Sequence, residues 1–136
     1  LLAQREILKQ KFGKNVNYKP EDITPNKADQ EFLLKATKVI EKNISEPEFG
    51  SDQLAQEMFL SRSQLHRKTS AITGQSTGEF IRTIRLKKAA RLILEKQFSV
   101  TQIALEVGFS SPSHFTKAFK QMFGYLPSEY INRSNS

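Results

Sequence analysis

The sequence predicts an all-α protein in which two similar helix-turn-helix units are joined by one long helix. Three observations support this prediction. Residues 54–81 and 103–131 repeat one pattern, at an offset of 49 residues and then, after one inserted residue, of 50. Capping residues mark the helix boundaries in both copies. Between the copies, residues 79–98 contain no Gly or Pro that would interrupt a helix.

The first part of the chain is expected to contain a linker and one amphipathic helix. Residues 1–12 look like the end of a helix, whereas residues 13–28 carry Gly, Asn and two Pro and show no periodicity. We interpret residues 1–28 as a helix end and an extended linker from an upstream domain, so the chain is expected to be a piece of a longer protein. Apolar residues at helical spacing then predict a helix from Asp29 to Asn43.

The first helix-turn-helix unit is expected over residues 51–73. Ser51 precedes a short helix, and Asp52 is well placed for the positive end of that helix. Ser61 begins a second, longer helix with a capping-box pattern, and this helix is expected to end near Gly74. A short helix, a tight turn and a longer helix are the parts of this motif.

Two residues of the first unit depart from the pattern of a well-packed helix-turn-helix. Phe59 takes the place in the turn that Gly108 has in the second copy. Because glycine adopts a left-handed conformation easily and phenylalanine does not, we expect a first turn that is wider or slightly strained. Thr69 follows Leu65 by one helical turn, where an apolar residue is expected. Its methyl group is expected to pack inward and its hydroxyl to bond back to a carbonyl one turn earlier.

A long connector helix and a second unit complete the predicted fold. The connector is expected over residues 77–96, a length of roughly 20 residues or about 30 Å, and its apolar residues cover more than one face. The second unit is expected over residues 99–123, where serine caps again mark the helix starts. We assign residues 29–133 to one domain that contains both units, and residues 134–136 to a tail.

The charge of the chain points to a polyanionic partner. The net charge is +7. Residues 1–49 hold nine Lys/Arg and eight Asp/Glu, a difference of +1, whereas residues 50–136 hold twelve and six, a difference of +6. An excess of this kind suits nucleic acid, an anionic membrane or an acidic protein. Taken by itself, the charge is equally consistent with a soluble basic surface.

Composition argues against several other classes of protein. The chain contains no Cys, which excludes disulfides, thiolate zinc sites and thiol catalysis and fits a cytosolic setting. Its apolar runs are far too short to span a bilayer. Because the HExxH, P-loop and GxGxxG motifs are absent from the sequence, we expect neither an enzyme nor a bound metal or cofactor.

The predicted dimensions indicate duplex DNA. Successive major grooves on one face of B-DNA lie about 34 Å apart. A rigid helix of about 30 Å could therefore hold two recognition helices against the same face of a duplex. A monomer built in this way would read a tandem, non-palindromic site.

The repeated segments resemble a known family. Residues 29–133 resemble the AraC-type DNA-binding domain, and the segments that carry the resemblance are SRSQLHRKTSAITGQSTGEFIRTIRLKKAARLI and SVTQIALEVGFSSPSHFTKAFKQMFGYLPSEYI. The resemblance implies seven helices in two units and a role in transcription regulation. Residues 1–28, which contain YKPEDITPN, are similar to the stretch that joins a phosphorylatable receiver domain to this module in hybrid two-component regulators.

By this resemblance, three residues of the first unit occupy base-reading positions: Ser63, His66 and Arg67. The spacing agrees, because Leu65 and Ile72 are expected to face inward and to leave these side chains outward. Arg67 is expected to form a bidentate pair with a guanine, and a phosphate contact is the alternative. For His66, a solvated position on the helix surface is an equally good interpretation.

In the second unit the resemblance places Pro112, Ser113 and Lys117 at the base-facing positions. Proline has no donor and offers only apolar contact, and Lys117 lacks the planar fork of the arginine that is frequent there in the family. We therefore expect the second unit to contribute more to positioning than to specificity. His114 is expected to be packed or half-exposed rather than to read bases.

A further set of side chains is expected to contact DNA phosphates: Arg62, Lys68, Arg82, Arg85, Thr116 and Lys120. For Arg82, a brace between two helices is an alternative of equal weight. The remaining basic residues of the connector are interpreted as its solvated face: Lys87, Lys88 and Arg91.

Other functions fit the sequence less well. A basic helix suits a membrane surface, but the apolar residues of the connector are needed to hold the two units. Proteins that bind single-stranded RNA usually expose aromatic residues, whereas Phe and Tyr fall here at core spacing; binding of a protein stays open. The sequence thus predicts a cytoplasmic regulator that binds double-stranded DNA. RNA polymerase is a further candidate partner, membrane contact is not expected, and dimerisation is assigned to parts outside this chain.

Overall fold

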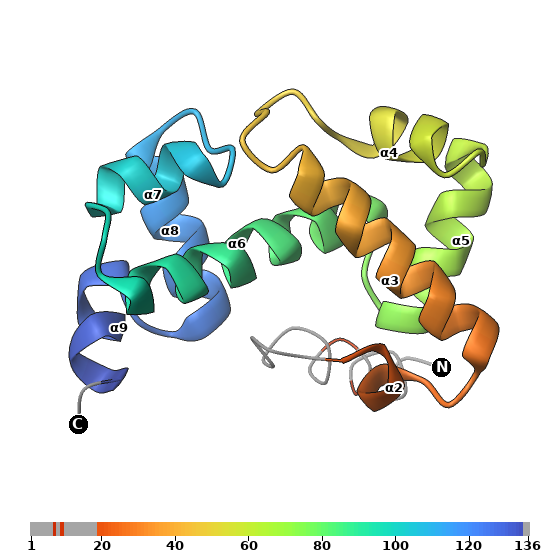
Figure 1. Ribbon diagram of the computed structural model, residues 1–136, viewed down its shortest axis with the longest axis horizontal. Helices are drawn as coiled ribbons and strands as arrows, with labels where there is room; N and C mark the ends of the chain where they lie inside the picture. Colours follow the sequence, from red (N-terminus) through yellow and green to blue (C-terminus); the bar gives the residue numbers. More distant parts are fainter. Residues whose placement is uncertain (1–6, 8, 10–18, 135–136) are drawn as a thin grey trace.

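The computed structural model describes residues 7, 9 and 19–134, without the side chains of residues 131–134, and this part of the chain is all-helical (Figure 1). Its helices are α2 (Pro20–Ile23), α3 (Lys27–Lys42), α4 (Ser51–Glu57), α5 (Arg62–Thr73), α6 (Thr77–Glu95), α7 (Val100–Glu106), α8 (Pro112–Phe123) and α9 (Pro127–Ser134). The predicted fold class is confirmed, with one short helix more than expected. Within the described residues, no helix is both long enough and apolar enough to cross a membrane.

Helix α6 connects two hydrophobic cores. Phe80, Ile81 and Ile84 of its first half are buried among apolar side chains of α2–α5. Its second half places Leu86 and Ile93 in a separate core with α7 and α8. Because each half of α6 is enclosed by its own unit, its apolar residues cover more than one face, as predicted. The helix has 19 residues, which corresponds to about 28 Å.

Serine caps set the helix starts where the sequence indicated them. The side-chain oxygens of Ser61, Ser76 and Ser99 accept hydrogen bonds from the backbone N–H three residues later, at 3.1, 3.2 and 3.1 Å. Each cap satisfies an N–H group that the helix itself leaves unpaired. The prediction for α4 is wrong by one residue, because Gly50 is its N-cap and Ser51 is its first helical residue.

The two helix-turn-helix turns have the same backbone geometry. Phe59 has a φ of 57° and Gly108 a φ of 85°, both in the left-handed region. The N–H of the next residue bonds back to a helix carbonyl in each copy, Leu60 to Ala55 at 3.0 Å and Phe109 to Ala104 at 2.9 Å. The first turn is therefore not wider than the second. It is strained, because a phenylalanine adopts the conformation that favours glycine.

Thr69 is fully buried in the first unit, but its hydroxyl does not behave as predicted. Its Oγ1 has no hydrogen-bond partner among the described residues. The bond back to a carbonyl is made instead by Thr73, whose Oγ1 donates to the carbonyl oxygen of Thr69 at 2.7 Å. Thr69 thus packs in the first core as an apolar residue would.

The folded unit begins earlier in the chain than the sequence suggested. Residues 20–23 form α2 rather than extended linker, and Ile23 is buried in the first core. Helix α3 starts at Lys27 instead of Asp29, because the side chain of Asn26 caps it by accepting from the N–H of Asp29 at 3.0 Å. The prediction of a helix over residues 1–12 lies largely outside the described residues; Ile7 and Lys9 are helical.

Candidate nucleic-acid interface

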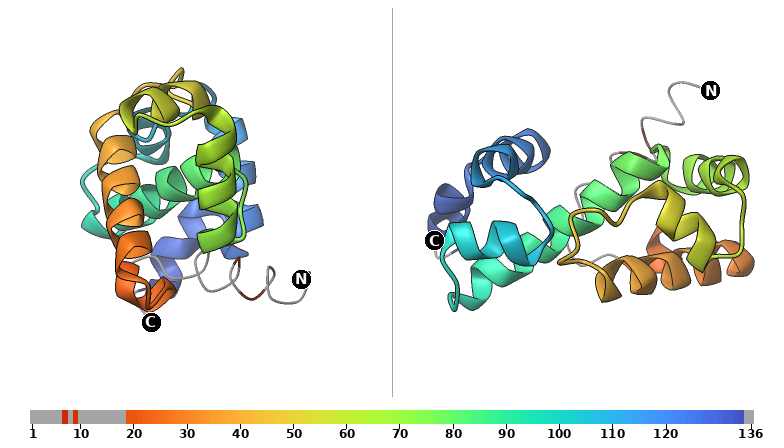
Figure 2. Two further views of the ribbon diagram at one scale, coloured as in Figure 1. Left: turned by 90° about the vertical axis from the view of Figure 1, so that its right-hand side faces the viewer. Right: turned by 90° about the horizontal axis from the view of Figure 1, so that it is seen from above.

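The second helices of the two units, α5 and α8, are the candidate recognition helices. Both are 12 residues long and end at a left-handed glycine. Figure 2 shows them on the same side of the molecule and near opposite ends of α6, whereas α3 lies on the other side. The structure therefore presents two equivalent helices in one direction, with α6 as a spacer between them.

Helix α5 turns its polar face toward a groove. Leu65 and Ile72 are buried beneath the helix, as expected. The outward side chains Arg62, Ser63, His66 and Arg67 are all exposed and line a groove of about 850 Å³. The other residues of this groove are Ser51, Ser76, Thr77 and Gly78. The three base-reading candidates of this unit thus lie together on one open surface.

The start of α6 contributes part of this groove, which the sequence analysis did not anticipate. The backbone N–H groups at the beginning of a helix carry partial positive charge, although the capping box of α6 already pairs those of Ser76 and Glu79. In the sequence, the capping box of Ser76 and Glu79 was the signal that a helix starts here. Burial by itself would raise the pKa of Glu79, but hydrogen bonds from Ser76 and the ammonium group of Lys9 lower it. The Lys9 Nζ lies 3.1 Å from the Glu79 carboxylate.

Two basic residues of α5 are free of strong competing partners. Arg67 is exposed and makes no hydrogen bond or ion pair with the described residues. Arg62 pairs with Asp52, with 2.9 Å between Nε and Oδ1, but both side chains are largely exposed. Because solvent weakens such a pair, the guanidinium of Arg62 stays accessible to an anion.

Lys68 points away from the groove. Its ammonium group lies over the ring of Phe32 in α3, 5.5 Å from the ring centre. Lys68 is absent from the residues that line the groove. A phosphate contact by Lys68 would therefore be at the edge of the interface.

Helix α8 presents its candidates in the same manner. Phe115, Ala118 and Phe119 are buried, and the exposed side chains include Pro112, Ser113, His114, Lys117 and Lys120. Thr116 is half-buried, and its hydroxyl already donates to the carbonyl of Pro112 at 2.9 Å. Because a hydroxyl has one proton, Thr116 can donate to a phosphate only if it gives up this bond.

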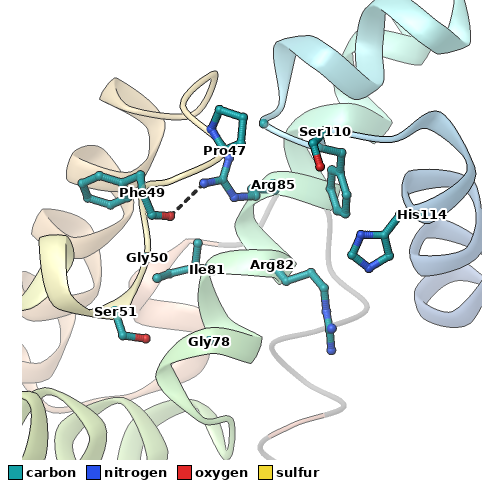
Figure 3. A pocket seen from close by; sticks show the side chains of 12 residues that line it. Pro47, Phe49, Gly50, Ser51, Gly78, Ile81, Arg82, Arg85, Ser110 and His114 are labelled. Atoms are coloured by element: carbon teal, nitrogen blue, oxygen red, sulfur yellow. Dashed lines mark hydrogen bonds between the residues drawn. The ribbon is translucent and has the colours of Figure 1, made fainter.

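A smaller pocket of about 310 Å³ separates the two units (Figure 3). Arg82 and His114 line it from α6 and α8. Arg82 is exposed and makes no hydrogen bond with the described residues, so the alternative of a helix brace finds no support. His114 is exposed, and its ring meets the ring of Phe109 edge-on, with 5.5 Å between the ring centres.

Arg85 does not fit the prediction of a phosphate contact. Its side chain is only 6% exposed. The guanidinium donates to four backbone carbonyls: Ile44 at 2.5 Å and Val107 at 2.8 Å from Nη1, and Glu46 at 3.0 Å and Phe49 at 2.9 Å from Nη2. Burial lowers the pKa of Arg85. The bracing role that was considered for Arg82 thus belongs to its neighbour one turn along the helix.

The connector is also less solvated than predicted. Lys87 is 1% exposed, and burial together with the charge of Arg91 lowers its pKa to about 7. Arg91 is half-buried and pairs with Glu41 of α3, with 3.0 Å between Nη2 and Oε2. Lys88 is half-buried. The interpretation as a solvated face was wrong because the two units enclose α6 on several sides.

The sequence of this chain is similar to those of known proteins. The helix-turn-helix domain family matches residues 54–133. Histidine kinase P4 of Formosa agariphila is 38% identical over 133 residues, which cover 98% of this chain and 10% of that protein. The chain spans between 10% and 34% of the length of the first curated relatives that it matches.

Solved structures agree with the fold and with the resemblance noted from the sequence. A transcriptional regulator of Chromobacterium violaceum, described as AraC-type DNA-binding domain-containing, superposes with a TM-score of 0.72 and 30% identity, over 79% of this chain and 96% of that chain. The DNA-binding domain of AdpA, a global transcriptional factor solved with a target DNA, gives a TM-score of 0.67 and 25% identity, over 76% of this chain and 92% of that chain. The chain belongs to the helix-turn-helix domain family and, within it, to the AraC-type DNA-binding domains.

Proposed function

We propose that this domain is a transcription regulator that binds double-stranded DNA sequence-specifically, with α5 and α8 in two successive major grooves. The observation that carries the proposal is their position on one side of the molecule, near opposite ends of the 19-residue helix α6 (Figure 2). The length of this helix, about 28 Å, is close to the distance of about 34 Å between successive major grooves on one face.

In this proposal the first unit supplies most of the sequence preference. Arg67 pairs with a guanine, because its guanidinium is exposed in the groove and has no competing partner among the described residues. Ser63 and His66, which line the same groove, contact neighbouring bases. In the second unit the base-facing residues are Pro112, Ser113 and Lys117, which offer fewer directional donors.

Phosphate contacts hold both helices in register. We assign them to the accessible cations Arg62, Arg82 and Lys120. Lys68 lies at the edge of the interface, and Thr116 is a weaker donor because its hydroxyl is already bonded. The difference of +6 between basic and acidic residues over residues 50–136 supports this assignment. The AdpA domain, which was solved in complex with a target DNA and shares the fold at 25% identity, supports the proposal of DNA binding in general.

We extend the proposal to the longer protein. The likeness to Histidine kinase P4, of which this chain covers 10%, supports a role as the output module of a signal-responsive two-component regulator, with residues 1–28 as the link to an upstream domain. Dimerisation is assigned to parts outside this chain, and RNA polymerase is a candidate partner once DNA is bound. A regulator that binds the chromosome works in the cytoplasm, and we place this domain there.

Selection of bound duplexes from a random pool tests the function. The proposal predicts enrichment of a site with two conserved segments about 10 base pairs apart. Affinity for the selected duplex should fall with salt at a slope near −0.9 per phosphate contacted. Lys38→Ala is the matched control for Arg67→Ala in the groove, because it also removes one exposed positive charge but lies in α3, on the other side of the molecule (Figure 2). A pool without enrichment, or equal affinity for RNA of the same sequence, would refute the proposal.

A further inference from the structure

The guanidinium of Arg85 joins the two units directly. Its side chain starts on α6 and reaches the junction between the units (Figure 3). Three of the carbonyls that accept from it belong to the segment between α3 and α4: Ile44, Glu46 and Phe49. The fourth belongs to Val107, at the turn between α7 and α8. One planar group is thus bonded to the segment that leads into the first helix-turn-helix unit, where Phe49 is buried in the first core, and to the turn of the second unit.

The second unit is shaped to admit this guanidinium. Gly108 follows Val107 with a φ of 85°. A Cβ at this position would overlap the Nη1 of Arg85 and the carbonyl oxygen of Ile44. Gly108 is therefore needed for close approach as well as for the turn. The side chain of Ile44 packs against both hydrophobic cores, which makes the junction continuous.

We propose that Arg85 is a positioning residue that fixes the orientation of α8 relative to α5, and with it the spacing of the two DNA segments that the domain recognises. This inference rests on the proposed function. A single helix leaves each unit free to rock about its own packing contacts, whereas a rigid planar fork holds four carbonyls in one arrangement. Lysine carries the same charge but lacks this fork, so it cannot bond to all four carbonyls in one plane.

The orientation can be measured without DNA. The chain contains no Cys, so a pair of spin labels at Lys42→Cys in α3 and Gln121→Cys in α8 reports the distance between the units. Both positions are exposed. We expect a narrow distance distribution with Arg85 present and a broader or shifted one in Arg85→Lys. Arg91→Lys, which changes a half-buried arginine of the same helix that pairs with Glu41, is the matched control and should keep the narrow distribution.

DNA binding then tests the consequence for recognition. Wild-type protein and Arg85→Lys are titrated with duplexes that carry both segments at the selected spacing, at one base pair more or less, or only one segment. Arg85→Lys should lose roughly tenfold or more in affinity for the selected spacing, prefer it less over the others, and bind single segments as the wild type does. An unchanged preference for spacing together with an unchanged label distance would overturn the inference.

If the wild-type protein gains nothing from the second segment, the proposed function fails, while the label distances still decide whether Arg85 sets the orientation. If Arg85→Lys does not fold, side-chain NMR of the wild-type guanidinium decides instead. We expect slow rotation about its C–N bonds and slow exchange of its protons with solvent; a single averaged, rapidly exchanging signal would overturn the inference.

Discussion

Replacing Phe59 by glycine should stabilise the first unit. Phe59 has a φ of 57° in the turn between α4 and α5. A left-handed conformation costs a residue with a Cβ about 1–2 kcal/mol, and glycine avoids this strain. The ring is 88% exposed, so its removal uncovers little apolar surface.

One loss in Phe59→Gly is the contact with Lys35, whose Nζ lies 5.5 Å from the ring centre. An exposed contact of this kind contributes roughly 0.5 kcal/mol. Glycine also gives the unfolded chain more conformational freedom, which costs roughly 0.5 kcal/mol. The net gain is therefore roughly 0.5 kcal/mol in the free energy of unfolding, which corresponds to a rise in Tm of roughly 2 °C for a domain of this size.

Thermal unfolding followed by circular dichroism measures the effect. Phe59→Ala is the matched control, because it removes the same ring but keeps a Cβ in the left-handed region. We expect its Tm to be at or slightly below that of the wild type. If Phe59→Gly is no more stable than Phe59→Ala, the left-handed φ of Phe59 costs the protein no stability and the prediction is wrong.

Three further predictions concern other sites. The pKa of Lys87 is lowered to about 7 in the folded state, so the unfolded chain binds more protons between pH 7 and pH 9.5 and the wild-type protein should become more stable over this range. Urea titrations should show a rise of at most about 3 kcal/mol in the free energy of unfolding of the wild type and none in Lys87→Met. Thr69→Val should raise the free energy of unfolding by about 1 kcal/mol, because it removes a buried hydroxyl that has no partner among the described residues. Thr73→Val removes a bonded hydroxyl and should lower it; a calorimetric Tm that is higher for Thr73→Val than for Thr69→Val would contradict this. Arg67→Ala should relax the preference at one base step and leave binding to random duplex nearly unchanged, and a uniform loss across duplexes would identify a phosphate contact instead.

Local chemistry was sufficient to predict most of the fold. The capping serines Ser61, Ser76 and Ser99 act within one helical turn, so the sequence alone places them. The repeat predicted that Phe59 and Gly108 occupy the same position in the two turns, and their backbone angles confirm it. The outward direction of the candidates on α5 and α8 also followed from helical spacing.

Features that depend on distant partners could not be predicted in the same way. Arg85 is buried because it finds carbonyls between 22 and 41 residues away in the sequence, and helical spacing does not show where carbonyls will be. Buried neighbours on the same helix, Ile81 and Ile84, were the available signal. Helix α2 is too short to be stable alone, and its formation accompanies the packing of Ile23 in the first core.

Hydroxyl-radical footprinting on the selected duplex tests most directly whether α5 and α8 engage DNA together. Two protected segments on the same face, about 10 base pairs apart, are the predicted result. Insertion of two glycines at Ile84 in the middle of α6 should remove one of them, since it separates the units. A single protected segment with the wild-type protein, or a footprint that the insertion leaves intact, would contradict the account.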